Sequence, residues 1–227
     1  MALGFLTTLP AGGKPGDAAA FRRAVACYPY VGLLLGALLT LAAALFFWLW
    51  PGTVAGVLTL ALWLALTGML HLDGLLDVAD ALFLPAEPER RREVMADPAI
   101  GAFAFGAGAV HLLLKAALVA AAGPSPALFF APVWARTLLL LAVWRTPPAA
   151  SGLGARVAGG GAWWGLLPGV LAFWAAPLGA VLAFAGGLVL YRLAQQRLGE
   201  VRGDVFGALV EAAEVMFLLG AILRPGV

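Results

Sequence analysis

The residues of this chain that are best suited to chemistry are three aspartates at the end of an apolar segment. Asp73, Asp77 and Asp80 are spaced by four and then three residues. In a helix this spacing stacks the three carboxylates on one face within about two turns. Like charges repel, so such a face is stable when a cation lies among them, and carboxylate oxygens suit Mg²⁺, Mn²⁺ or Ca²⁺ better than zinc or copper. Gly74 leaves room for a bulky group to approach the backbone.

A second acidic face occurs near the end of the chain. Glu211 and Glu214 follow Asp204 by 7 and 10 residues, so in a helix the three share a broad face, which also carries Gly207. A carboxylate near the centre of a membrane helix costs on the order of 2.5 kcal/mol or more. We therefore expect these side chains to face a polar cavity and not lipid.

The composition indicates which elements position these residues. Of the 227 residues, 63% are hydrophobic and 11% are charged, against about 45–50% and about 25% in soluble domains. This favours an all-α, polytopic integral membrane protein with six or seven spans of about 20 residues each, forming a single transmembrane domain over residues 1–227. The candidate spans are Ala26–Trp50, Val54–Leu70, Ile100–Ala122, Ala127–Trp144, Trp163–Ala175, Leu178–Leu193 and Val205–Leu223.

Two of these spans carry a further expectation. The helix that includes Thr59 to Leu70 is expected to continue without a break into the aspartate segment. The span Trp163–Ala175 is the weakest, and a hairpin half or an interfacial segment is the alternative for it.

The distribution of charge predicts the orientation. When the N-terminus is placed in the cytoplasm, the arginine-rich loops all fall on that side, and the connections on the other side carry no charge. The loops concerned contain Arg90–Arg92, Arg145 and Arg156, and Arg192, Arg197 and Arg202. By the positive-inside rule we expect a cell inner membrane protein with its N-terminus and active site facing the cytoplasm. A net charge of +2 gives no indication of nucleic-acid binding.

The acidic faces and the arginine loops together are typical of phosphoryl transfer. A metal held by carboxylates polarises phosphate oxygens, arginines neutralise developing charge, and one carboxylate can accept a hydroxyl proton.

Several motifs also resemble one family. The chain is similar to the cobalamin synthase (adenosylcobinamide-GDP ribazoletransferase) family at Phe5–Pro10, Tyr28–Gly32, Gly68–Asp80, Glu93–Gly101 and Gly203–Glu214. The resemblance implies a metal-dependent enzyme that joins adenosylcobinamide-GDP to α-ribazole, or to α-ribazole 5′-phosphate, and releases GMP. The aspartate motif is also similar to that of the CDP-alcohol phosphotransferases, although the full pattern of that group is absent.

On this basis we assign roles as hypotheses. The resemblance implies Mg²⁺, with Mn²⁺ as the alternative, held by Asp73, Asp77, Asp204, Glu211 and Glu214. Asp80 is the candidate base and Asp77 the second catalytic carboxylate. The residues expected to contact substrate are His71, Gly74, Asp97, Arg202, Gly203 and Gly207. The partners expected are the two substrates and membrane lipids, and association into a homo-oligomer is left open.

The chain departs from the family pattern in two loops. Ala96 and Pro98 stand where a lysine and a serine are expected, and Glu200 and Arg202 fall in a segment where Gly-Gly-x-Thr is expected. Arg202 is the residue that can replace the lost charge. The carboxylates are unaffected.

Other interpretations remain open from the sequence alone. Glu211 and Glu214 can form an intramembrane ion pair with Lys115 or Arg136, and this would not exclude a role in the site. Arg90–Arg92 are more typical of topology and anionic-lipid contact than of substrate binding. His71 can be a helix-end histidine satisfied by backbone. The rival functions are a lipid-headgroup phosphotransferase and a cation transporter, but a transporter predicts a repeat, which the sequence lacks.

Overall fold

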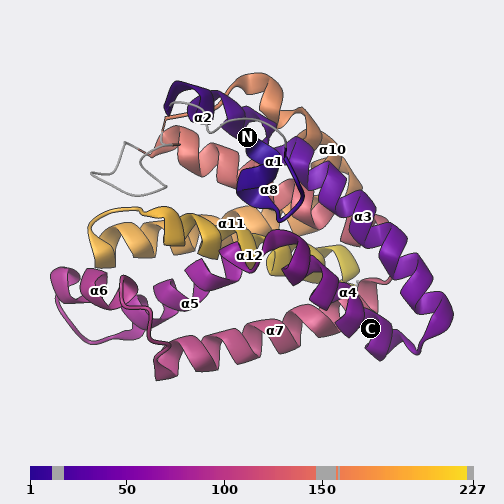
Figure 1. The fold of residues 1–227 in the computed structure, drawn as a ribbon, viewed down its shortest axis with the longest axis horizontal. Helices are drawn as coiled ribbons and strands as arrows, with labels where there is room; N and C mark the ends of the chain where they lie inside the picture. The colour runs from indigo at the N-terminus through magenta and orange to yellow at the C-terminus, as the bar shows by residue number, and fades with distance from the viewer. Residues whose placement is uncertain (12–17, 147–156, 158, 224–227) are drawn as a thin grey trace.

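The computed structural model describes residues 1–11, 18–146, 157 and 159–223, and this part of the chain is helical (Figure 1). The first helices are α1 (Ala2–Leu6), α2 (Ala18–Ala24), the short 3₁₀ helix η1 (Val25–Cys27), α3 (Tyr28–Leu49), α4 (Gly52–Thr67), α5 (Leu70–Phe83) and α6 (Pro88–Met95). They are followed by α7 (Ala102–Ala122), α8 (Pro126–Arg145), the 3₁₀ helix η2 (Trp163–Leu166), α10 (Leu167–Ala175), α11 (Pro177–Leu198) and α12 (Gly203–Ile222).

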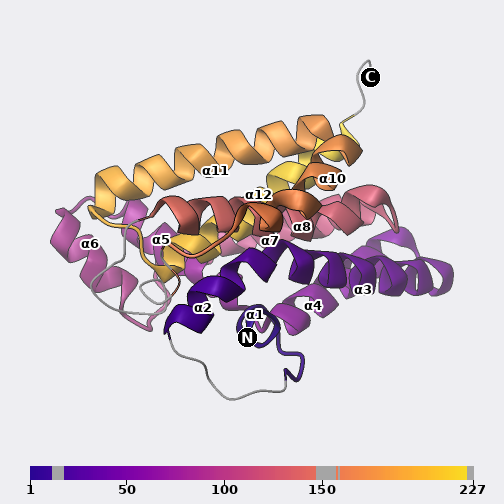
Figure 2. The same ribbon diagram turned by 90° about the horizontal axis from the view of Figure 1, so that it is seen from above.

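Two helices form the centre of the bundle. In α8 and α12, 61% and 72% of the residues in the most apolar stretch are buried, against 22–33% in the other long apolar helices. Figure 2 shows α11 as an outer layer on one side of α12, with α3 and α4 on the opposite side of the molecule. Gly32 and Gly36 let α3 lie directly against α8, since a Cβ at either position would clash with the α8 backbone. The other long helices present mostly exposed apolar side chains outward.

The prediction of a polytopic all-α membrane protein is confirmed. Among the described residues, five helices are long and apolar enough to cross a membrane, and the bent pair α4 and α5 makes a sixth candidate span. Trp163–Ala175, predicted as the weakest span, is a shorter apolar segment made of η2 and α10.

The prediction of one continuous helix into the aspartate segment is wrong. Between α4 and α5 the chain bends by 91°, because Gly68 and Met69 adopt left-handed backbone conformations, with φ of 60° and 58°. Gly68 ends α4 as a left-handed C-cap. Thr8 then satisfies carbonyls at the end of α4, with its hydroxyl donating to Ala65 and its amide donating to Leu66. The three aspartates still share one helix, because α5 contains all of them.

Candidate active site

The site is built where α5 crosses α12 at close range. A Cβ at Gly74 would lie 2.6 Å from the backbone oxygen of Asp204, and a Cβ at Gly207 would lie 3.1 Å from the backbone oxygen of His71. Larger residues at these two positions would push the helices apart. The two glycines therefore bring the aspartate face of α5 against the first turn of α12. Gly74 acts at this crossing, whereas Gly207 lies both at the crossing and in the wall of the adjacent pocket.

Three carboxylates at this crossing have no partner, and we call Asp73, Asp77 and Asp204 the open carboxylates. Within the described part of the chain, none of their side chains forms a hydrogen bond or an ion pair. The negative charge of Asp77 is repelled by those of Asp73, Asp204 and Asp80. The charge of Asp204 is repelled by that of Asp73 and attracted by that of Arg202, without a direct ion pair in the described part of the chain. Carboxylates that repel one another and form no direct ion pair provide the oxygen donors that a hard divalent cation prefers.

The open carboxylates do not yet converge on one point. Among the described residues, no group of three His, Cys, Asp or Glu side chains is close enough to hold a metal ion as it stands.

A pocket of about 350 Å³ lies beside the open carboxylates. Six residues that the sequence predicts for the site line it, namely His71, Asp73, Arg202, Gly203, Asp204 and Gly207. Its other walls come from distant parts of the chain and include Phe5, Leu6, Tyr28, Leu139, Val143 and Val157. The pocket therefore has an acidic side, one arginine, and an apolar wall contributed by α1, α3 and α8.

His71 lies between this pocket and the interior. Its side chain is buried, at 3% exposure, and neither ring nitrogen has a hydrogen-bond partner in the part of the chain that the structure describes. The backbone-satisfied histidine considered from the sequence is therefore not what the structure contains. The ring is within electrostatic reach of Arg136, Glu211 and Lys115. An unsatisfied buried imidazole that lines a pocket can donate to or accept from a bound ligand.

The two glutamates of α12 lie in a buried ionic cluster, which we call the closed cluster: His111, Lys115, Arg136, Glu211 and Glu214. Lys115 Nζ donates to Oε2 of Glu211 at 2.6 Å and to Oε2 of Glu214 at 2.5 Å. Arg136 Nη1 pairs with Oε1 of Glu214, and His111 Nε2 lies 2.7 Å from Oε2 of Glu211. Lys115 also lies over the ring of Trp63 in α4, 4.5 Å from its centroid.

The ion-pair alternative therefore describes Glu211 and Glu214 in this structure. α7 supplies His111 and Lys115, and α8 supplies Arg136. The predicted role of the two glutamates as metal ligands stays a prediction, since pairing does not by itself exclude it.

Asp80 and Asp97 lie outside the pocket wall. The two oxygens of Asp80 accept hydrogen bonds from the backbone amides of Gly101 at 2.7 Å and Ala104 at 2.8 Å, so this carboxylate caps the N-terminus of α7. Asp97 is exposed in the loop between α6 and α7, where its Oδ1 accepts a hydrogen bond from the amide of Ala99.

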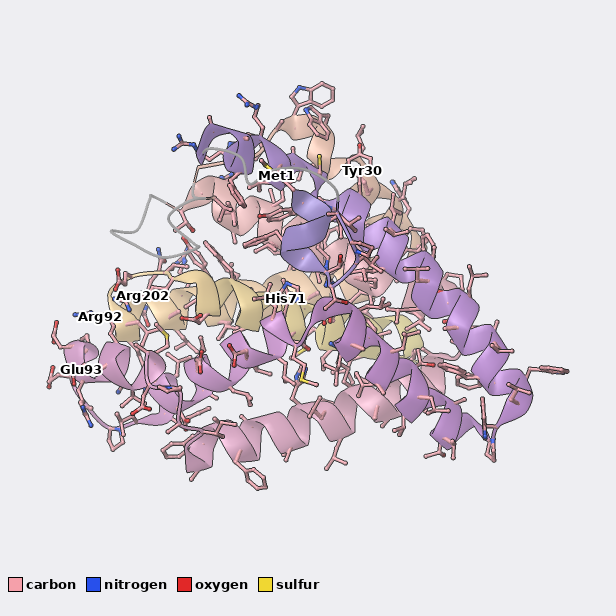
Figure 3. The ribbon with its side chains drawn as sticks, viewed as in Figure 1. Met1, Tyr30, His71, Arg92, Glu93 and Arg202 are labelled. Carbon is pink, nitrogen blue, oxygen red and sulfur yellow. The ribbon has the colours of Figure 1, made fainter. Side chains whose placement is uncertain are left out.

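The arginines of the α6 region bind mainly protein groups. Arg91 donates to the carbonyls of Ala81, Leu82 and Ala86, at the end of α5 and just beyond it. Arg92 donates to the carbonyl of Leu198 at the end of α11. Figure 3 shows Arg92 and Arg202 at the same end of the molecule, with His71 deeper inside.

Salt bridges neutralise much of the charge of this region. Arg90 pairs with Glu93, and Arg92 pairs with Glu89. A hydrogen bond from its own backbone amide, together with the charge of Arg92, lowers the pKa of Glu89. Arg202 pairs with Glu200 at 2.6 Å while lining the pocket. Arg202 thus brings positive charge to the pocket, whereas Arg91 and Arg92 tie α5 and α11 to α6.

Comparison with known proteins decides the family. The sequence model of cobalamin-5-phosphate synthase matches residues 1–222. The chain belongs to this family. The family resemblance predicted from the motifs is thereby confirmed, and the chain is a membrane-embedded transferase of cobalamin biosynthesis.

Curated relatives in the family are similar along almost the whole chain. The adenosylcobinamide-GDP ribazoletransferase of Deinococcus radiodurans is 41% identical over 231 residues, covering 96% of this chain and 82% of the relative. The enzyme of the same name from Stutzerimonas stutzeri is 40% identical, covering 100% and 98%. That from Desulfitobacterium hafniense is 37% identical, covering 97% and 94%. No solved structure is significantly similar to the chain.

Sequence reasoning missed the apolar wall of the pocket and the pairing of His111 with Glu211 in the closed cluster. Phe5 and Tyr28 lie in motifs that carry the family resemblance, so their position in two short matching segments was an available signal. Val143 gave no such signal, because a valine is typical of any membrane helix, and Val157 lies between two predicted spans in a segment without a recognised motif. His111 lies one turn from Lys115, but the spacing of these two residues does not reveal the acidic partner of the imidazole.

Proposed function

We propose that the chain joins adenosylcobinamide-GDP to α-ribazole, or to α-ribazole 5′-phosphate, in the pocket between α5 and α12, with release of GMP. The observation that carries this proposal is the presence of unpaired carboxylates from two helices beside Arg202 in a pocket of about 350 Å³. In this reaction an acceptor hydroxyl oxygen bonds to the phosphorus nearer the corrinoid. The bond from that phosphorus to the GMP oxygen breaks, and the hydroxyl proton passes to a carboxylate.

We further propose that Asp73, Asp77 and Asp204 hold Mg²⁺, with Mn²⁺ as a substitute. The ion would supply charge neutralisation and polarisation of the diphosphate oxygens. The oxygen-only donor set, and the lack of any ion pair or hydrogen bond to these side chains in the described ranges, support this assignment. Glu211 and Glu214 then act by holding α7, α8 and α12 together behind the site.

The remaining roles belong to groups in or beside the pocket. Arg202 neutralises charge on the departing phosphate, and its pairing with Glu200 orients the guanidinium. His71 offers a ring nitrogen to the substrate at the inner end of the pocket. Of the two candidate bases, Asp77 is the one we favour, because Asp80 uses both oxygens to cap α7. The two roles of Asp77 are alternatives, and it would act as the base where Asp73 and Asp204 alone hold the ion.

The orientation is also a proposal. The N-terminus and the pocket face the cytoplasm, because the arginine-rich loops lie on the same side of the membrane as the N-terminus when the predicted spans are threaded in order. The nucleotide and ribazole substrates are water-soluble and would enter from the same side as this charge.

The experiment is coupling of adenosylcobinamide-GDP to α-ribazole by purified protein in lipid, with GMP release as the readout and Mg²⁺ compared with chelator. We expect metal-dependent product that is lost in Asp73→Asn and Asp77→Asn, whereas Glu93→Gln, on the exposed face of α6, keeps its activity. No product from intact protein with either metal would indicate that Ala96, Pro98, Glu200 and Arg202 mark a changed substrate. A lipid alcohol would then be tested as the acceptor.

A further inference from the structure

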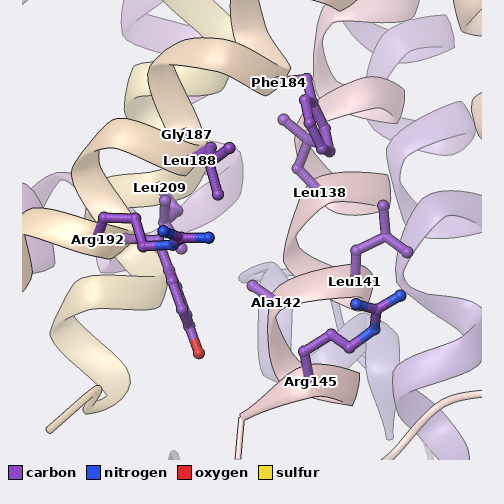
Figure 4. A pocket seen from close by; sticks show the side chains of 10 residues that line it. Leu138, Leu141, Ala142, Arg145, Phe184, Gly187, Leu188, Arg192 and Leu209 are labelled. Atoms are coloured by element: carbon purple, nitrogen blue, oxygen red, sulfur yellow. The ribbon is translucent and has the colours of Figure 1, made fainter. Parts of the chain in front are cut away.

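A second cavity, of about 300 Å³, lies between α8 and α11 with α12 behind it (Figure 4). Most of its lining is apolar, and we call it the α8–α11 groove. The side chains that form it are Leu138, Leu141, Phe184, Leu188 and Leu209. It is distinct from the candidate active site, because α8 turns Leu139 and Val143 toward that site and turns Leu138 and Leu141 toward the groove.

Two arginines lie at one end of this groove. Arg145 is the last residue of α8, and Arg192 lies in the last two turns of α11. Both are exposed, and neither forms an ion pair or a hydrogen bond within the described part of the chain. Among the residues that the structure describes, no acidic side chain lines the groove. Beside them the hydroxyls of Tyr191 and Thr146 are hydrogen-bonded to each other at 2.9 Å. The groove thus combines an apolar body with two unpaired positive charges at one end.

The apolar part of the groove is open to the membrane. Phe184 is 50% exposed and Leu188 is 44% exposed, and both belong to α11, which is a candidate span. Arg145 lies at the C-terminal end of α8, and Arg192 lies near the C-terminal end of α11, which connects to α12. The end of a membrane helix is where it reaches the level of the lipid headgroups. An occupant that satisfies both parts has a hydrocarbon chain and an anionic head.

We propose that the α8–α11 groove binds one anionic phospholipid, with an acyl chain along the apolar wall and its phosphate at Arg145 and Arg192. Gly187 lines the groove, and a Cβ there would make ordinary van der Waals contacts with Leu138 and Leu209 at 3.8 Å, so that a methyl group fits whereas a larger side chain would occupy the groove. The volume is at the lower end of the roughly 300–1,000 Å³ typical of ligand pockets, which suits one chain. A second copy of the protein is a poorer occupant, because a contact between two such grooves would bring together the arginines of both copies without an acidic lining residue, among those described, to neutralise them.

The first test is native mass spectrometry of the delipidated protein with phosphatidylglycerol and, separately, with phosphatidylcholine. We expect one retained phosphatidylglycerol and at least about tenfold weaker binding of phosphatidylcholine. The double variant R145Q/R192Q should lose at least about tenfold in affinity for phosphatidylglycerol. The matched control R22Q/R23Q removes the same charge from α2, where both side chains are exposed, and should bind as the wild type does.

A second pair of variants tests the acyl chain. Gly187→Leu fills the groove and should abolish retention, whereas Gly187→Ala should keep it, with size-exclusion profiles confirming that both are folded. Equal binding of the two lipids, equal losses in R145Q/R192Q and R22Q/R23Q, or retention by Gly187→Leu would overturn the proposal. Displacement by inorganic phosphate alone would mean that the arginines bind a free anion. A dimer that separates only in R145Q/R192Q would mean that the groove is a subunit interface.

Discussion

The open carboxylates and the closed cluster contain the same chemical group in opposite states. Asp204 and Glu211 lie on one helix, about two turns apart, yet Asp204 has no partner in the described structure and Glu211 is held by His111 and Lys115. The difference is made by α7 and α8, which bring their cations to the deep part of α12 only. A carboxylate of α12 is therefore structural where α7 or α8 supplies a cationic side chain. It is available for a ligand where α12 faces α5.

Removal of Lys115 from the closed cluster should cause the largest loss of stability. Lys115→Met leaves Glu211 and Glu214 buried without their ammonium partner, so we expect a loss of about 3–5 kcal/mol in the free energy of unfolding. Thermal unfolding in detergent measures this loss. Arg90→Met is the control, because it breaks an exposed pair and should cost less than about 1 kcal/mol. Unchanged stability with loss of metal-dependent activity would instead support the glutamates as metal ligands.

Neutralisation of an open carboxylate should have the reverse pattern. In Asp204→Asn we expect coupling activity to fall by about 10³-fold, or about 4 kcal/mol, because the metal loses a ligand. Stability should be unchanged or increased, because the substitution relieves the repulsion from Asp73. Initial rates of GMP release and unfolding temperature give the two values. A destabilisation as large as that of Lys115→Met would show that Asp204 is structural.

The helix crossing that holds the open carboxylates can be tested by one methyl group. In Gly74→Ala the new Cβ would lie 2.6 Å from the backbone oxygen of Asp204, so α5 and α12 must separate. We expect the free energy of unfolding to fall by about 1–3 kcal/mol and the rate of coupling to be lower. Gly106→Ala is the matched control, because a Cβ there meets nothing within 4 Å. Equal effects of the two substitutions on melting temperature and rate would contradict a close crossing.

The smallest expected effect is a difference in stability between variants of the two candidate bases, Asp80 and Asp77. Asp80→Ala removes the cap of α7 and should cost about 1–2 kcal/mol of stability, whereas Asp77→Ala should cost none because it removes a repelled charge. Chemical unfolding of both variants in the same detergent makes this comparison. A larger loss of stability in Asp77→Ala than in Asp80→Ala would show that Asp77 has a structural partner and is not a free carboxylate.

The sequence predicts the acidic faces well because they depend on local periodicity. Asp73, Asp77 and Asp80 lie in one helix as expected, although Asp80 then turns to α7 while the other two stay free. The sequence also contains the only intramembrane cations that could pair with the glutamates, so Lys115 and Arg136 were predictable as partners. Whether the glutamates pair with these cations or face the site could not be predicted, because it depends on how α7 and α8 pack on α12.

The bend before α5 shows the limit of such predictions. A glycine after Thr67 is a common helix end, but Met69 follows it in a left-handed conformation that non-glycine residues rarely adopt. Hydropathy gives no signal there, since the apolar run continues through the break. The carbonyls freed at the end of α4 are satisfied by Thr8, which lies about 60 residues away in sequence. Contacts of this range are not encoded in any local pattern.

The closed cluster also has a consequence for biogenesis. Lys115 and Arg136 belong to helices that are synthesised before α12, and their carboxylate partners arrive only with the last helix. Until α12 is inserted, two cations lie unpaired in or near hydrocarbon, and each costs about 2.5 kcal/mol or more in free energy. Nascent chains that stop before α12 should therefore be held by the insertion machinery or degraded. Membrane quality control can in this way distinguish a finished chain from an unfinished one.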